Sequence, residues 1–437
     1  MIYDNEADSM LVACLQGGEI PKETFSVPGD DDDEHEDLDD VENWEVAKNW
    51  CPQKPGNISG IYVSADGKIE SELAETLRKK LLADFADTVF RPQIYSDPPE
   101  RVLGALHTIK LKEGVQPVYH HPFQLAGERR KAMEDIVNQW VEVGKIERPT
   151  KHEGWGAPVF PIPKKNGEWR GISDHRGLNE RVQRDNYPLP LIEGILQRKG
   201  RCKMFTKLDL KDAFSQVPLS PECRHLTTIN TPLGPFQWKV LPQGYCNSPS
   251  VFQRMMDLIY YPVRDVVDNY IDDGIVGTSE GTNEEEEIWH HFHQVYRVLE
   301  VLKANMLVLD PKKCEFFMRR VEFCGHVMEN GSRRPAPGKL LAVEKWPPPN
   351  TVTKMRGFLG FANYYSSYVK NFAEMAAPLM DKLKVGRTLG KKGSKHPIFL
   401  SESDLEAFQK LKAALLSGLS LQAVNPDAPF VLRVDAL

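Results

Sequence analysis

The chain has 437 residues, of which 41% are hydrophobic and 27% are charged, and its formal net charge at pH 7 is −7. This length exceeds what one hydrophobic core usually serves, and the apolar content excludes a wholly disordered chain, so we expect two or more subdomains. No run of residues is apolar for long enough to span a bilayer, and the N-terminus lacks the basic flank and apolar stretch of a secretion signal. We therefore expect an intracellular protein that is not secreted and has no membrane partner.

The charge is unevenly distributed along the chain. Residues 1–47 hold 16 acidic residues and one lysine, a balance of −15, which leaves residues 48–437 at +8 because −7 minus −15 is +8. A basic body favours a polyanionic partner. The seven cysteines are odd in number and lack Cys-x-x-Cys spacing, which indicates free thiols in a reducing compartment and argues against a structural zinc site.

The chain begins with a segment too acidic to bury a core. Its densest part is residues 30–37, and we predict a disordered acidic linker over residues 1–68. The functional alternative is a segment that imitates nucleic acid and covers a basic groove. Apolar residues then recur at helical spacing over residues 70–90 and 127–144, which predicts two amphipathic helices that face the core.

Residues 156–174 predict a projecting β-hairpin. Asn166-Gly167 between two extended runs is a strong hairpin signal, and the prolines of the first run argue against a central strand position. Lys164, Lys165 and Arg170 are then held on an exposed finger, where cations can meet phosphates. The plainer interpretation is a basic hairpin that only keeps the protein soluble.

Residues 203–219 predict a strand that ends near Asp209 and a short helical turn after it. A carboxylate in such an apolar run costs several kcal/mol if it is left unpaired, so Asp209 needs a cation or a hydrogen-bond donor. A metal ion meets that need, and so does a cap on the following turn. Residues 238–253 continue as a strand, a loop and a helix capped by Ser248, with Pro249 in its first turn.

Residues 266–277 predict a second hairpin, whose tight bend carries Asp272 and Asp273 because Asp-Gly supplies positive φ angles. Side chains alternate along a strand, so adjacent carboxylates reach one centre only near a bend, and we expect Asp272 to be the principal ligand. Asp209 and Asp272 then lie on neighbouring strands of one antiparallel sheet packed on helices, an α+β arrangement. An ordinary solvated Asp-Gly turn is the alternative.

The remaining elements are mostly helical. A helix is predicted from Glu284 to about Met306, and its histidines, His290, His291 and His293, are interpreted as surface residues rather than zinc ligands. Prolines at 347–349 mark a subdomain boundary, and residues 353–369 form a helix whose aromatic stripe suits a core more than base stacking. A flexible segment, a helix from about Ser403 to Leu416 and a strand at 430–435 follow.

In this order the motifs resemble the reverse transcriptases of gypsy-like LTR retrotransposons, which are parts of retroviral-type Pol polyproteins. Residues 270–273 resemble the YxDD box, and residues 208–214 resemble the strand with the other catalytic aspartate. The remaining matching segments are 241–253 beside the incoming nucleotide, 164–179 in the fingers, and 313–327 and 356–365 in the primer grip and thumb. Leu-Pro-Gln-Gly at 241–244 looks more retroviral than gypsy-like, which leaves the lineage open.

The resemblance implies an α+β fold of the right-hand polymerase type, with fingers, palm and thumb and an antiparallel palm sheet packed on helices. After the linker, its expected parts are N-terminal helices and fingers (69–205), the palm with the YIDD hairpin (206–318), the primer grip and thumb-like helices (319–385), and a linker, helix and truncated first strand of an RNase H-like domain (386–437). Since the other RNase H carboxylates are absent, we expect a polyprotein fragment without RNase H activity.

The same resemblance implies roles for individual residues. Asp209, Asp272 and Asp273 are the implied catalytic and metal-binding residues, holding two Mg²⁺ ions or Mn²⁺ in their place. The implied dNTP-binding residues are Lys164, Arg170, Asp212, Ala213, Phe214 and Gln243, with Phe214 under the deoxyribose to reject ribonucleotides. The implied primer grip is Phe323, Cys324 and Gly325.

The implied function is that of an RNA-directed DNA polymerase, a nucleotidyltransferase that extends a primer on an RNA or DNA template with dNTPs. Such an enzyme acts in the cytoplasm, in a particle or in the nucleus, and the sequence does not specify its oligomeric state. The alternative is an inactive retroelement relic that only binds nucleic acid. The three intact carboxylates favour the enzyme, whereas the truncation at Leu437 and the acidic leader favour the relic.

Overall fold

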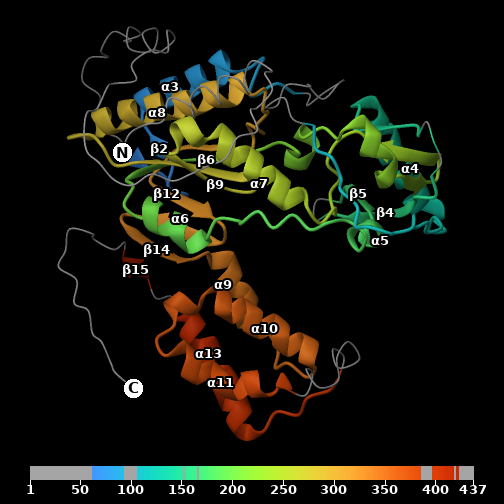
Figure 1. The fold of residues 1–437 in the computed structure, drawn as a ribbon. Helices are drawn as coiled ribbons and strands as arrows, with labels where there is room; N and C mark the ends of the chain where they lie inside the picture. The colour runs from blue at the N-terminus through green and yellow to red at the C-terminus, as the bar shows by residue number, and fades with distance from the viewer. Residues whose placement is uncertain are drawn as a thin grey trace, which may run out of the picture.

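The computed structural model describes residues 62–92, 106–149, 151, 153–164, 167–384, 396–417 and 420–422. Figure 1 shows three parts: a sheet covered by helices α3, α7 and α8, a second sheet with α4 beside it, and a third part that combines β12, β14 and β15 with helices α9, α10, α11 and α13. Within the described residues, no helix is both long and apolar enough to cross a bilayer. The helices and the mainly antiparallel sheets confirm the expected α+β class.

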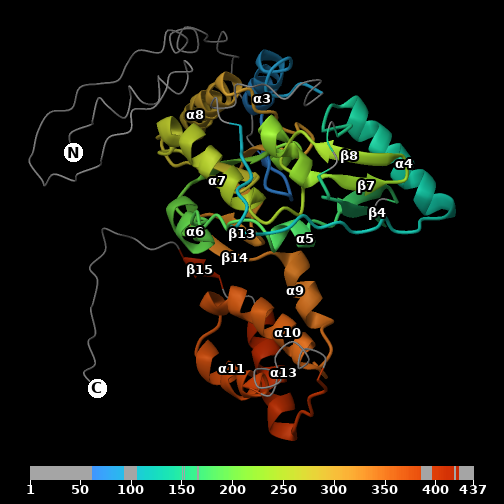
Figure 2. The same cartoon turned by 45° about the vertical axis from the view of Figure 1, so that its right-hand side comes forward.

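The first part is built on an antiparallel sheet of four strands. In spatial order they are β11 (Glu315–Met318), β6 (Met204–Asp209), β10 (Asp273–Thr278) and β9 (Val267–Tyr270). Three helices pack on this sheet or on one another: α3 (Glu72–Asp84), α7 (Ser248–Ile259) and α8 (Glu284–Ala304). Figures 1 and 2 both show α3 and α8 side by side. We call this part the palm, because it has the antiparallel sheet packed on helices that the resemblance implies for that part.

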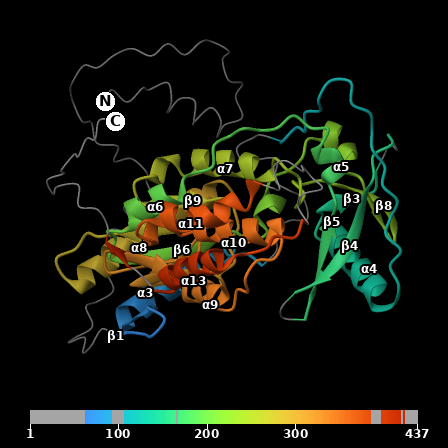
Figure 3. The ribbon, with the colours of Figure 1, turned by 90° about the horizontal axis from the view of Figure 1, so that it is seen from below.

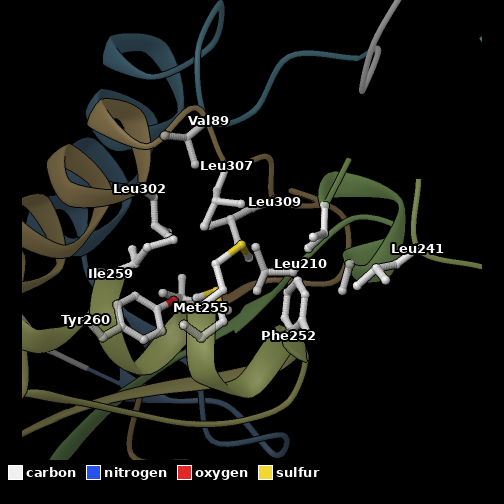
Figure 4. Close-up of a cluster of buried hydrophobic side chains, with 14 of the residues drawn as sticks. Val89, Leu210, Leu241, Phe252, Met255, Ile259, Tyr260, Leu302, Leu307 and Leu309 are labelled. Atoms are coloured by element: carbon white, nitrogen blue, oxygen red, sulfur yellow. The ribbon is translucent and has the colours of Figure 1, made fainter. Parts of the chain in front are cut away.

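The apolar face of α7 anchors the palm core. Phe252, Met256 and Ile259 are at most 2% exposed, and Figure 4 shows α7 side chains meeting those of Leu302, Leu307 and Leu309. The hydrophobic effect therefore holds α7 firmly against the neighbouring elements, since each such side chain contributes about 1.5–3 kcal/mol on burial.

The second part, the fingers, contains a five-stranded sheet. Its strands in order are β3 (Ile146–Glu147), β8 (Gly234–Trp238), β7 (Ile229–Thr231), β4 (Ala157–Pro163) and β5 (Trp169–Ser173). Helix α4 (Gly127–Glu142) packs against β4 and β5 (Figure 1), and the short α5 (Arg176–Asn179) follows β5. The strands β4 and β5 form the expected hairpin, whose tip residues 165 and 166 lie outside the described residues.

The expectation that prolines keep β4 out of an interior position is wrong, because β4 lies between β5 and β7. The parallel β4–β7 pairing is limited to the first two residues of β4, Ala157 and Pro158. Ala157 donates its N–H to the Thr228 carbonyl, and the carbonyl of Pro158 accepts from Asp174. Pro161 and Pro163 lie further along β4, where β5 is its only partner strand. The N–H groups that these prolines lack therefore interrupt no hydrogen-bond ladder.

The third part contains a small sheet and a helical bundle. The sheet strands are β12 (Arg320–Phe323), β13 (His326–Glu329), β14 (Ser332–Pro335) and β15 (Leu421–Gln422). The helices are α9 (Pro337–Glu344), α10 (Val352–Tyr364), α11 (Phe372–Asp381) and α13 (Glu402–Leu416). Figure 3 shows α10, α11 and α13 grouped together when the molecule is seen from below. The aromatic stripe of α10 faces this core, with Phe358 fully buried.

Two boundaries differ from the sequence-based division. Residues 62–63 form β1, which pairs with β2 (Ile69–Glu70), so regular structure begins inside the segment that we assigned to the acidic linker. Helix α13 shares one apolar core with α9, α10 and α11, so the thumb-like bundle continues beyond residue 385 to Leu416. Residues 1–61 and the strand expected at 430–435 lie outside the described residues.

Two local expectations are wrong. The N-cap of α7 is Asn247, and Ser248 is already helical, with its hydroxyl donating to the Pro242 carbonyl. His291 is not a surface residue, because its ring is fully buried between the Thr206 and Thr278 hydroxyls at 2.8 and 2.9 Å. Burial lowers the pKa of His291 to about 3, so the ring is neutral and acts as a hydrogen-bonded link between α8 and the palm sheet.

Candidate active site

Three acidic residues, Asp209, Asp272 and Asp273, lie at one end of the palm sheet. Strands β6 and β10 pair antiparallel, and their register places Asp209 directly opposite Asp273. Asp272 precedes Asp273 in the β9–β10 turn, and its carbonyl accepts the Leu210 N–H at 3.3 Å. Directly opposed residues of an antiparallel pair point to the same face, so the acidic groups from positions 209 and 273 share one side of the sheet.

The bend of the β9–β10 hairpin lies one position earlier than expected. Ile271 has the positive φ angle, 57°, whereas Gly274 lies within β10 opposite Leu208. A Cβ on Gly274 would stand 3.4 Å from both the Leu208 Cβ and the Tyr260 hydroxyl. Gly274 is therefore suited to close packing against β6 rather than to the turn, and Asp273 is the first residue of a strand.

The three acidic groups influence one another electrostatically. Burial raises the pKa of Asp273, Lys207 opposes this shift, and the charges of Asp272 and Asp209 raise the pKa further. Two ammonium groups partly balance the carboxylates: Lys313 Nζ lies 3.0 Å from Asp209 Oδ1, and Lys207 Nζ lies 3.8 Å from an Asp273 oxygen. The site therefore concentrates negative charge and attracts cations.

The donor chemistry suits a hard divalent cation, although the side chains are not arranged as a finished metal site. Carboxylate oxygens are the ligands that Mg²⁺ prefers. Among the described residues, no three His, Cys, Asp or Glu side chains converge closely enough to hold a metal ion. Lys313 instead donates to Asp209 Oδ1.

The 3₁₀ turn after β6 carries two of the expected nucleotide-binding residues, Ala213 and Phe214, and a third, Asp212, directly precedes it. It spans Ala213–Gln216 and follows Asp212, whose φ is 45° and whose carboxylate accepts from Lys145 Nζ at 2.8 Å. Ala213 is buried, and the half-buried Phe214 ring packs edge-on against Phe252 with centroids 5.8 Å apart. The turn lies close to the palm carboxylates because it directly continues the Asp209 strand.

The other expected nucleotide-binding residues lie on the fingers side. Lys164 pairs with Glu168 at 2.9 Å across the β4–β5 hairpin, and Arg170 lies on β5 opposite Ile162. Gln243 is exposed in the loop before α7, and its carbonyl accepts from Ser173 at 3.5 Å. No contact between these side chains and the palm carboxylates is present among the described residues.

The expected primer grip is the turn between β12 and β13. Tyr364 and Tyr365 of the thumb donate their hydroxyls to the Cys324 and Gly325 carbonyls at 2.5 and 3.0 Å. Burial raises the pKa of Cys324 to about 12, with smaller contributions from Asp273 and Asp272, so this turn lies beside the carboxylates. Phe323 is 0% exposed, however, and its side chain belongs to the core beneath the turn rather than to a surface for a primer.

Comparison with known proteins identifies this arrangement. Residues 162–328 match the family model described as reverse transcriptase (RNA-dependent DNA polymerase). The chain contains a reverse transcriptase domain. The matched range includes every residue expected at the site from its sequence, from Lys164 to Gly325.

The relatives of this reverse transcriptase domain include Pol polyproteins of retrotransposons, which confirms the resemblance to gypsy-like elements. The Pol polyprotein from the Drosophila melanogaster transposon gypsy is 31% identical over 81% of this chain, and that from transposon 297 is 29% identical over 73%. These alignments cover 34% and 29% of the relatives, so the chain spans about a third of their length.

Solved reverse transcriptases share the fold at low identity. The foamy viral protease-reverse transcriptase in complex with double-stranded DNA superposes with a TM-score of 0.68 at 19% identity, covering 86% of this chain and 76% of that one. The same enzyme with an RNA/DNA hybrid gives a TM-score of 0.67 at 19% identity, covering 87% and 50% of the two chains. These likenesses confirm the right-hand polymerase fold.

Two residues beside the carboxylates of the reverse transcriptase domain were not singled out from the sequence. Lys313 contacts Asp209 across 104 positions of the chain. Gln253, which is fully buried in α7, accepts the Ile271 N–H at 2.8 Å. Both lie inside motifs that carry the family resemblance, but a motif alone does not show which partner a side chain meets.

Proposed function

We propose that this protein is an RNA-directed DNA polymerase that extends a primer with dNTPs on an RNA or DNA template. The placement of Asp209 opposite Asp273, with Asp272 in the adjoining turn, carries this proposal. The reverse transcriptase family match over the same residues supports it.

A template-primer duplex is the macromolecular partner that we propose. The foamy viral relatives are described in complexes with double-stranded DNA and with an RNA/DNA hybrid. The +8 charge of residues 48–437 suits such a polyanion. Because phosphates dominate this kind of binding, the affinity for template-primer should fall steeply as the salt concentration rises.

We propose Asp209, Asp272 and Asp273 as the residues that would hold Mg²⁺, or Mn²⁺ in its place. Bound divalent cations supply charge neutralisation at the attacking and leaving oxygens of an in-line phosphoryl transfer. Burial raises the pKa of Asp273, and the nearby charges of Asp272 and Asp209 raise it further, which supports this assignment because cations would balance carboxylates brought close together. Asp272 is the most exposed of the three.

The surrounding residues would bind and orient the substrates. Lys164 and Arg170 would pair with the triphosphate, as cationic side chains on a stiff hairpin can do. The amides of Asp212 and Ala213 would donate to it, Gln243 would contact the nucleotide, and the Phe214 ring would exclude a 2′-hydroxyl. The Cys324–Gly325 turn would position the primer end through its backbone.

Primer extension on poly(rA)/oligo(dT) with Mg²⁺ and with Mn²⁺ tests this function. The protein should extend the primer, and Asp272→Asn should abolish extension while the dissociation constant for template-primer stays nearly unchanged. Asp265→Asn is the matched control, since Asp265 is 57% exposed and pairs with Arg297 away from the turn. Full extension by Asp272→Asn would remove Asp272 from catalysis.

The same experiment separates the enzyme from the relic. A wild-type protein that binds template-primer but extends nothing with either ion would be a relic that only binds nucleic acid. Incubation with an RNA/DNA hybrid whose RNA strand is labelled tests the expectation that the chain does not cleave RNA.

A further inference from the structure

The turn that presents Asp272 adopts an unfavourable backbone conformation. Ile271 has φ 57°, a region that β-branched residues rarely occupy and that costs of the order of 1–3 kcal/mol. Such a conformation persists only when the surrounding structure holds it. The peptide groups of Ile271 are held on both sides, because its N–H donates to Gln253 Oε1 at 2.8 Å and its carbonyl accepts from Asn269 Nδ2 at 3.5 Å.

Gln253 is itself held in one orientation. Its side chain is 0% exposed, and its Nε2 donates to Asp257 Oδ1 at 2.7 Å. The other carboxylate oxygen of Asp257 accepts the Tyr187 hydroxyl at 2.6 Å. A carboxylate can only accept and an amide N–H can only donate, so the Gln253 amide must direct its oxygen toward Ile271.

The support for this chain of hydrogen bonds is rigid. Gln253 and Asp257 lie on α7, whose apolar side is buried in the palm core (Figure 4). Burial raises the pKa of Tyr187 to about 12, with further contributions from the Asp257 bond, so its hydroxyl remains a donor at neutral pH. The chain therefore links a fixed helix to the one strained residue before Asp272.

We propose that Gln253 is a positioning residue of the polymerase site, which holds the Ile271 peptide and thereby sets the direction of Asp272 and Asp273. This inference rests on the proposed function and adds a residue that touches neither substrate nor reacting atoms. Tyr187 and Asp257 complete the device by fixing the Gln253 amide. A misplacement of catalytic groups by about 1 Å can lower a rate about 100-fold, so a loosened turn should reduce kcat.

An exchange of amide and carboxylate tests the proposal. Gln253→Glu keeps an acceptor for Ile271 but places two carboxylates against each other, and kcat should fall about 10- to 100-fold. The double variant Gln253→Glu with Asp257→Asn restores every bond, because the amide at position 257 then donates to the carboxylate at position 253, the reverse of the wild-type bond. The kcat of the double variant should return to within about three-fold of wild type. This recovery is not expected if Gln253 only fills space in the core.

The readouts separate positioning from folding and binding. For Gln253→Glu, the KM for dTTP and the template-primer dissociation constant should stay within about two-fold of wild type. Gln237→Glu is the matched control, since Gln237 is 5% exposed and donates to Glu147 at 2.8 Å in the fingers. If circular dichroism shows that Gln253→Glu does not fold, Gln253→Met replaces it in the test. This variant removes the same hydrogen bonds at similar side-chain volume and should lower kcat to a similar extent.

The outcomes are distinct from those of the proposed function. Absence of extension by the wild-type protein would overturn the proposed function itself. With an active wild type, a normal kcat in Gln253→Glu, or a double variant as impaired as the single one, would overturn the positioning role alone. Restoration by the double variant would support it.

Discussion

Lys313 is expected to compete with metal ions for Asp209. Its ammonium group lies 3.0 Å from Asp209 Oδ1, an oxygen that we propose as a metal ligand. Although burial opposes its charge, the hydrogen bond to Asp209 and the charge of that residue raise the pKa of Lys313, so the competitor is charged at neutral pH. Lys313→Met removes this charge at similar side-chain length and should lower the Mg²⁺ concentration needed for half-maximal extension.

The expected size of this decrease in Mg²⁺ concentration follows from the exposure of the Lys313–Asp209 ion pair. The Lys313 side chain is 60% exposed and that of Asp209 is 23% exposed, so water and salt screen most of the attraction. Pairs of this kind contribute about 0.5–1 kcal/mol. If Mg²⁺ no longer has to displace Lys313, this free energy lowers the Mg²⁺ concentration for half-maximal extension, the Mg²⁺ midpoint, by a factor of about two to five.

Single-turnover primer extension, titrated with Mg²⁺ at constant ionic strength, measures this midpoint. Lys312→Met is the matched control, because it removes the same charge one residue away and should leave the midpoint unchanged. The midpoint is separate from the maximal rate, so an additional effect of Lys313 on catalysis does not obscure the result. An unchanged or higher midpoint in Lys313→Met would refute the competition.

Three further predictions concern selectivity, backbone and pH. Phe214→Val should admit ribonucleotides and lower the dTTP over UTP ratio of kcat/KM by about ten-fold or more; an unchanged ratio contradicts a steric gate. Gly325→Ala should lower stability by about 1–2 kcal/mol, because φ is +77° and a Cβ would lie 2.9 Å from the Tyr365 hydroxyl; a melting temperature equal to wild type argues against it. His291 has a folded-state pKa of about 3, below its ordinary 6.5, so the unfolded state binds more protons in acid. The free energy of unfolding should therefore fall by about 1.4 kcal/mol for each pH unit below 6.5. Urea unfolding of His291→Gln should show a smaller decrease of this free energy with falling pH than the wild type shows.

The sequence predicted local elements well where the signal was local. The strand ending at Asp209, the hairpin over residues 266–277 and the helix starting at Glu284 are present. Periodicity and turn residues act over a few positions, so a single segment contains enough information to specify them. The buried aromatic stripe of α10 was likewise predicted from its spacing.

Predictions that depended on partners from elsewhere failed or were not made. The bend lies at Ile271 rather than at Asp-Gly, and the Ile271 N–H there donates to Gln253 of α7. His291 is buried because Thr206 and Thr278, on two different strands, satisfy both ring nitrogens. Neither partner is visible from the segment itself.

The amino-acid sequence by itself determined which acidic residues the chain offers, which strands carry them and which family they resemble. Only the tertiary structure decided that Asp209 stands opposite Asp273, that Lys313 reaches Asp209, and that Gln253 holds the turn. The reason is physical: strand register and side-chain contacts across a hundred positions are selected by packing of the whole core, whereas local propensity extends over one turn or one strand.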